Sequence, residues 1–174
     1  MGAKWQRIAI SIPEGYKPAE RVAIAEEILD FIRDRVQNKN LDKNNRKLPG
    51  YSKSYMNSLD FKIAGKSKGD VNLTLSGDML GAMTLLSHAN GKLLLGFEKG
   101  SPENARADGN IRGTYGNSKP VAAPRDFLGL TQKDLTRILK EFPVDNDQKR
   151  EANTVASKIA RSLADGRAEA EIDD

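Results

Sequence analysis

Apolar and polar positions alternate near the start of the chain and then change to a helical spacing. Ile8, Ile10 and Ile12 are separated by small residues, and this pattern predicts a half-buried β-strand over about residues 6–12. From Pro18, which suits the first turn of a helix, apolar residues recur every three or four positions to about residue 37. The members of this stripe are Val22, Ala25, Ile28, Leu29, Ile32 and Val36. They predict one long helix with an apolar face.

A polar stretch without hydrophobic periodicity follows, over about residues 38–58. It is rich in asparagine, lysine and serine, and a connection of this length is usually either functional or disordered. Its basic residues are Lys39, Lys43, Arg46, Lys47 and Lys53. Tyr51 and Tyr55 lie four positions apart, a spacing that places two side chains on one face of a helix. Two interpretations stay open here, a flexible surface loop and a functional loop.

The middle of the chain predicts a further strand and a hairpin. Val71, Leu73 and Leu75 alternate with polar residues, which is typical of a strand. Asn90–Gly91 is the strongest two-residue hairpin signal, because both turn positions require a positive φ. Alternating apolar residues flank this turn, with Met83 and Leu85 before it and Leu93, Leu95 and Phe97 after it.

A second long loop is predicted over about residues 100–124, where Glu103–Asp108 forms at most a short helical turn. Two helices then finish the chain, over about 131–142 and 146–164. The apolar face of the first contains Leu135, Ile138, Leu139 and Phe142, and that of the second contains Ala152, Val155, Ala156, Ile159, Ala160 and Leu163. Both follow the helical period.

The loop before the first of these helices is unusually apolar. It contains Phe127, Leu128 and Leu130, so we expect it to be pinned against a core or a partner and not left in water. Thr131 then offers an N-cap oxygen, and Asp134, three residues later, favours the first helical turn by its charge and by reciprocal capping.

Together these elements predict an α+β fold. The expected domain covers residues 1–164 and contains a small, mainly antiparallel sheet, one long packed helix and two C-terminal helices. Residues 165–174 form an acidic tail that is expected to be disordered.

Composition and charge narrow the class of protein. The 174 residues carry a net charge of +4, but the last ten contain five acids and one arginine, or −4, so the first 164 carry +8. A basic body with an acidic tail suits phosphate-rich or acidic partners. Cysteine is absent, which excludes disulfides and thiolate chemistry. No apolar run approaches 18 residues and no signal peptide is apparent, so we expect a protein made in a cytoplasm, without membrane contact.

The sequence offers no catalytic set. His88 is the only histidine and lies next to the predicted turn, where it is expected to be exposed and inert. The segment Asp60–Ser67 resembles a phosphate-binding loop, but aspartate replaces the first glycine and no helical pattern follows. We therefore expect no enzyme activity, no cofactor and no metal.

Three short strings, in this order, resemble those of one protein family, the neck and tail-completion proteins of tailed bacteriophages, which act in virion morphogenesis. The first string is Tyr51, Ser52, Lys53 and Tyr55; the second is Ser76, Gly77 and Leu80; the third is Pro124, Arg125, Phe127, Leu128, Gly129 and Leu130, followed by Thr131. In the family the first string ends a polar loop, the second leads into a β-hairpin and the third precedes an acidic helix.

The resemblance implies a structural virion protein at the joint between head and tail. Such proteins form rings with six-fold or twelve-fold symmetry around the DNA channel, between portal or head-completion proteins and tail-terminator or tail-tube proteins. The residues of the three strings would then serve packing or subunit interfaces, and Lys43, Arg46 and Lys47 would face the DNA channel. The implied location is the neck or the head-proximal tail of the virion, with the host cytoplasm as the place of assembly.

The basic polar loop also supports a second hypothesis, a small cytoplasmic module that binds nucleic acid without sequence specificity. Lys43, Arg46 and Lys47 would contact phosphates, and Tyr51 and Tyr55 would stack on bases. No recognised reader motif accompanies them. A steep salt dependence of binding would separate this module from a structural adaptor.

Overall fold

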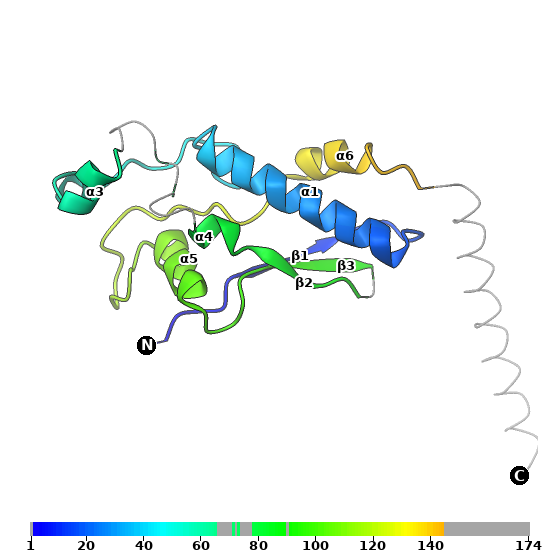
Figure 1. Ribbon diagram of the computed structural model, residues 1–174, viewed down its shortest axis with the longest axis horizontal. Coiled ribbons are helices and arrows are strands. Elements are labelled where there is room, and N and C mark those ends of the chain that lie inside the picture. Colours follow the sequence, from blue (N-terminus) through cyan, green and yellow to red (C-terminus); the bar gives the residue numbers. More distant parts are fainter. Residues whose placement is uncertain (1, 66–70, 72, 74–77, 90, 145–174) are drawn as a thin grey trace, which may run out of the picture.

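The chain folds as an α+β protein with one three-stranded antiparallel sheet (Figure 1). The computed structural model describes residues 2–65, 71, 73, 78–89 and 91–144. The elements in chain order are β1 (Arg7–Ser11), α1 (Pro18–Gln37), α2 (Lys53–Met56), α3 (Leu59–Ile63), α4 (Asp78–Gly81), β2 (Thr84–Ser87), β3 (Lys92–Gly96), α5 (Pro102–Arg112) and α6 (Gln132–Leu139). The strand order is β1-β3-β2, so the hairpin places its second strand at the centre of the sheet.

The register of the sheet brings its apolar residues to one face. Ile8 lies opposite Leu95 and Ile10 lies opposite Leu93, and directly opposed residues in antiparallel strands project to the same side. The predicted hairpin is confirmed, since β2 and β3 are antiparallel neighbours, although Asn90 of the predicted turn lies outside the described residues. The N–H of Lys92 donates to the Ala89 carbonyl oxygen at 3.0 Å across the turn.

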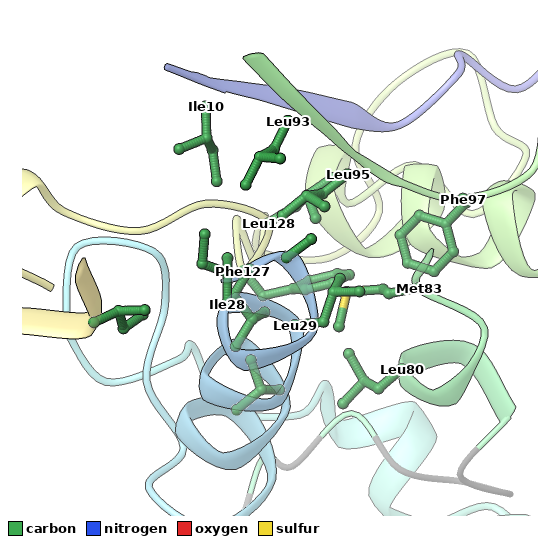
Figure 2. Close-up of a cluster of buried hydrophobic side chains, with 14 of the residues drawn as sticks. Ile10, Ile28, Leu29, Leu80, Met83, Leu93, Leu95, Phe97, Phe127 and Leu128 are labelled. Carbon is green, nitrogen blue, oxygen red and sulfur yellow. The ribbon is translucent and has the colours of Figure 1, made fainter. Parts of the chain in front are cut away.

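The long helix α1 covers this apolar face (Figure 1). Its bounds confirm the prediction at both ends, and the predicted stripe is buried except for Val22, with Ile24 added to it. Figure 2 shows side chains of α1, the sheet, α4 and the loop before α6 meeting in one core. The labelled members are Ile10, Ile28, Leu29, Leu80, Met83, Leu93, Leu95, Phe97, Phe127 and Leu128.

Two predictions in the middle of the chain differ from the structure. Val71 and Leu73 lie outside any strand, and Leu73 has φ +52°, a left-handed conformation that a strand does not allow. Leu75, the third residue of that predicted strand, lies outside the described residues. The second long loop contains an eleven-residue helix, α5, where at most a helical turn was expected. Both ends of this helix are capped, which favours its formation. At the N-terminus the Ser101 hydroxyl accepts the N–H of Asn104 at 3.0 Å, and at the C-terminus Gly113 adopts φ +69°.

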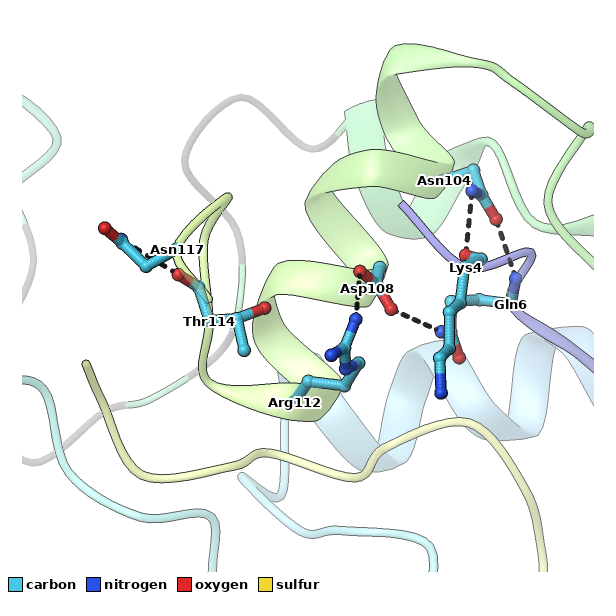
Figure 3. A network of polar contacts seen from close by, with 7 residues as sticks. All are labelled: Lys4, Gln6, Asn104, Asp108, Arg112, Thr114 and Asn117. Atoms are coloured by element: carbon cyan, nitrogen blue, oxygen red, sulfur yellow. Dashed lines mark hydrogen bonds and ion pairs between the residues drawn. The ribbon is translucent and has the colours of Figure 1, made fainter. Parts of the chain in front are cut away.

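Buried polar side chains attach α5 to the segment before β1 (Figure 3). Asn104 Oδ1 accepts the backbone N–H of Gln6 at 2.7 Å, and Asn104 Nδ2 donates to the Lys4 carbonyl oxygen at 3.1 Å. Asp108 accepts the Gln6 side-chain amide at 2.8 Å and pairs with Arg112 at 3.3 Å. These contacts make Asn104 and Asp108 structural, because their polar atoms are occupied by the chain itself.

Of the two predicted C-terminal helices, the first is confirmed as α6, which is shorter than expected. The second, at 146–164, and the acidic tail at 165–174 lie outside the described residues. Among the helices that the structure describes, none is long and apolar enough to cross a membrane.

Candidate interaction surface

The third string lies beside the first because one buried arginine joins them. Arg125 Nε donates to the Pro49 carbonyl oxygen at 3.1 Å, and its Nη2 donates to the Gly50 carbonyl oxygen at 2.8 Å. The same guanidinium lies over the Tyr51 ring, 5.3 Å from its centroid, and Nη1 donates to the Tyr115 hydroxyl at 2.8 Å. Arg125 is only 3% exposed. The first and third strings, more than seventy positions apart in sequence, are therefore in direct contact.

The first string builds an aromatic cluster with α3. The rings of Tyr51, Tyr55 and Phe61 lie within 5.1–5.6 Å of one another, centroid to centroid, in tilted and edge-on arrangements, as aromatic pairs prefer. Ser52 caps α2, since its hydroxyl accepts the N–H of Tyr55 at 3.3 Å. Lys53 begins α2 and is exposed. Tyr51 and Tyr55 lie together, but not on one helical face as their spacing predicted, because Tyr51 precedes α2.

A second buried arginine holds the apolar loop of the third string. Arg35, near the end of α1, donates through Nη2 to the carbonyl oxygens of Phe127 and Gly129, both at 2.7 Å. Burial lowers the pKa of Arg35, and the nearby charges of Asp134 and Asp42 oppose that shift. An arginine keeps its proton in proteins, so the loop is bound by a charged donor, and the prediction that it is pinned is confirmed.

The polar loop after α1 is bound to the loop of the third string. Lys43 donates its backbone N–H to the Asp126 carbonyl oxygen at 2.9 Å, and its Nζ pairs with the Asp126 carboxylate at 2.6 Å. Gly129 has φ +147°, and a Cβ there would lie 3.3 Å from the stem of Lys43. Glycine therefore lets the third string run close under this lysine.

Asp134 connects the polar loop to the start of α6. Its Oδ2 accepts the Thr131 hydroxyl at 2.6 Å and the Asn45 side-chain amide at 2.9 Å, and its N–H donates to the Thr131 hydroxyl at 3.2 Å. The predicted capping box is confirmed. Burial alone would raise the pKa of Asp134, but hydrogen bonds from Thr131 and Asn45 outweigh it and lower that pKa.

Replacing Asp134 with alanine removes half of the capping box and is expected to lower the free energy of unfolding at pH 7 by about 0.5–2 kcal/mol, the range found for a lost helix cap. Because the folded-state pKa of Asp134 is lowered, its contribution is present above the ordinary pKa and is lost as the pH falls through the folded-state value. Urea titrations at pH 7 and at about pH 2.5 would show the difference between wild type and variant shrinking in acid. Glu141→Ala, at an exposed carboxylate, is the control and should stay within about 0.5 kcal/mol of wild type at pH 7. An equal difference at both pH values would contradict the assignment.

The remaining predicted residues divide into buried and exposed ones. Leu80 of the second string lies in α4 and is buried in the core, whereas Ser76 and Gly77 lie outside the described residues. Pro124 is exposed and Leu130 is half-buried against the core. Of the three proposed DNA-facing cations, Lys43 is held in an ion pair, and Arg46 and Lys47 are exposed.

An apolar surface on α3 was missed at the level of sequence. Leu59 is 70% exposed and Ile63 is 74% exposed. They are four positions apart and so lie on one face of α3, while Phe61 points into the aromatic cluster. Their spacing was the available signal, but a helix of five residues is too short for its hydrophobic period to stand out.

This region combines buried polar contacts with an exposed apolar face. The buried arginines and Asp134 are occupied in holding loops. In the described part of the chain, no group of three or more histidine, aspartate or glutamate side chains is placed to hold a metal ion. What this region offers outward is the exposed apolar face of α3 with lysines beside it.

Comparison with models of known protein families, with curated proteins and with solved structures finds no match. The fold class, α+β, follows from the three-stranded sheet and the helices packed with it.

Proposed function

We propose that the protein is a structural component of a tailed-phage virion, an adaptor at the joint between head and tail that assembles as a ring around the DNA channel. In this role it transforms no substrate. Its partners would be portal or head-completion proteins on one side and tail-terminator or tail-tube proteins on the other.

The observation that carries the proposal is the contact between the first and third strings. Arg125 of the third string binds the loop that leads into the first string and lies over Tyr51 of that string. Each string resembles the family independently of the other. Their meeting in space supports a shared architecture, because chance matches distributed along a chain have no reason to converge on one buried arginine.

The surface supports assembly as well. A closed ring of identical subunits needs two different patches on each subunit. One of them would be the exposed pair Leu59 and Ile63, which belongs to α3, a helix near the C-terminal end of α1 (Figure 1). Rings of this kind are held by such heterologous contacts.

The alternative of a nucleic-acid-binding module receives less support. Tyr51 and Tyr55 pack against each other and against Phe61, so their rings are used within the fold. Lys43 is paired with Asp126. A stacking platform for single strands needs accessible ring faces beside unpaired cations.

The test is to delete the gene from the phage or prophage that carries it and to examine the particles by electron microscopy. We expect filled heads and separate tails, with joined virions restored by the wild-type gene supplied in trans. Purified wild-type virions should contain the protein in a fixed number of copies per particle. Complete, joined particles in the deletion, or a gene that lies outside any cluster of capsid and tail genes, would contradict the proposal.

A further inference from the structure

The two ends of α1 carry different features. At its C-terminal end lies the α2–α3 region with the exposed Leu59 and Ile63 (Figure 1). The described chain ends near the N-terminal end of α1, since the Tyr16 hydroxyl donates to the Phe142 carbonyl oxygen at 2.8 Å, two residues before Val144. The twenty residues of α1 separate these ends by roughly 30 Å.

The sequence after Val144 supplies an occupant for the exposed face. Residues 146–164 carry an apolar stripe of Ala152, Val155, Ala156, Ile159, Ala160 and Leu163, which predicts an amphipathic helix. Its small alanines permit a close approach to another helix. An exposed pair of large apolar side chains on α3 is the kind of surface against which such a stripe is buried.

The two segments also carry complementary charges. Residues 53–68 contain four lysines and one aspartate, or +3, whereas residues 165–174 contain five acids and one arginine, or −4. Lys53 and Lys62 are exposed and make no ion pair within the described part of the chain. When the stripe lies on α3, the acidic residues that follow it come close to these lysines.

We infer that residues 146–164 of one copy dock on the Leu59–Ile63 face of a second copy, with the acidic segment 165–174 placed against Lys53 and Lys62. The described chain ends near one end of α1 and the acceptor face lies near the other. The proposed contact therefore joins two different surfaces, is heterologous and repeats head to tail, and it closes into a ring when the rotation allows. This deepens the proposed function, on which its biological role rests, by naming the segments that join neighbouring subunits.

Cysteine cross-linking tests the contact, because the natural chain contains no cysteine. Two full-length variants, Ile63→Cys and Val155→Cys, are mixed at high protein concentration and oxidised. We expect a disulfide-linked heterodimer between them in excess of either homodimer. The matched controls are Thr154→Cys, which lies on the opposite side of the predicted helix from the stripe, and Glu98→Cys, an exposed position in the turn between β3 and α5.

The double variant Ile63→Cys/Val155→Cys separates contact between copies from contact within one. A ladder of covalent oligomers is the expected result, and a product that stays monomeric would overturn the inference, as would cross-linking no greater than in the controls. In analytical ultracentrifugation, Leu59→Ser/Ile63→Ser should weaken self-association about tenfold or more, since two large apolar side chains no longer become buried. Added salt should weaken it further in the wild type, because the contact of the acidic segment is screened.

These outcomes are independent of the deletion experiment. If cross-linking fails while deletion separates heads from tails, the adaptor role stands and this subunit contact is wrong. If cross-linking succeeds while joined particles form without the protein, the contact stands and the adaptor role is wrong.

Discussion

Replacing Phe127 with alanine is expected to lower the free energy of unfolding by about 3–5 kcal/mol, the usual cost of truncating a buried phenylalanine. Phe127 is 0% exposed. Its ring packs edge-on against Phe97 of the segment after β3, with the centroids 6.4 Å apart. The variant removes the ring from the point where the loop of the third string enters the core (Figure 2), and the loop cannot collapse freely because Arg35 holds its backbone.

Urea denaturation followed by circular dichroism measures this effect. Phe127→Leu keeps most of the volume and should lose clearly less than the alanine variant. Val121→Ala, at a position that is 60% exposed, should change the free energy of unfolding by no more than about 0.5 kcal/mol. A loss below about 1 kcal/mol for Phe127→Ala would show that the loop is not part of the core.

Replacing Arg125 with alanine is expected to cost about 3 kcal/mol, because charged hydrogen bonds are lost and their buried acceptors are left unsatisfied. The carbonyl oxygens of Pro49 and Gly50 lose their donor. The Tyr115 hydroxyl keeps only Asn110, to which it donates at 2.7 Å. The aromatic cluster also loses the guanidinium that lies over Tyr51, so we expect α2 and α3 to loosen before the rest of the fold.

Hydrogen exchange resolved by peptide distinguishes this local effect from global unfolding. In Arg125→Ala, protection should fall first over residues 49–63, while β1 and β3 keep theirs under native conditions. Arg125→Lys is the matched control: it keeps the charge, but its single ammonium does not reproduce the planar fork, so a partial loss is expected. Uniform loss of protection across the sheet would contradict a local role for Arg125.

Much of the fold was predictable where side chains follow a period. The stripe of α1 and the alternation of β1 and β3 come from local geometry that each segment imposes on itself. The hairpin and the capping box at Thr131 were predictable for the same reason, because turn and cap chemistry acts over two to four residues. The helix α5 was missed because its interior contains Asn104, Asp108 and Gly109, which weaken a helical pattern. Its formation depends on the contacts of Asn104 and Asp108 with Lys4 and Gln6.

The sequence by itself therefore determined the α+β class, the long helix, the central hairpin and the apolar character of the loop before α6. Only the tertiary structure decided that Arg35 and Arg125 are buried and donate to loop carbonyl oxygens. It also decided that Arg125 lies over Tyr51, and that Leu59 and Ile63 remain exposed. The reason is physical. Periodicity and capping depend on neighbours a few residues away, whereas the burial of a charge or the exposure of an apolar side chain depends on which distant backbone carbonyls and rings the fold brings beside it.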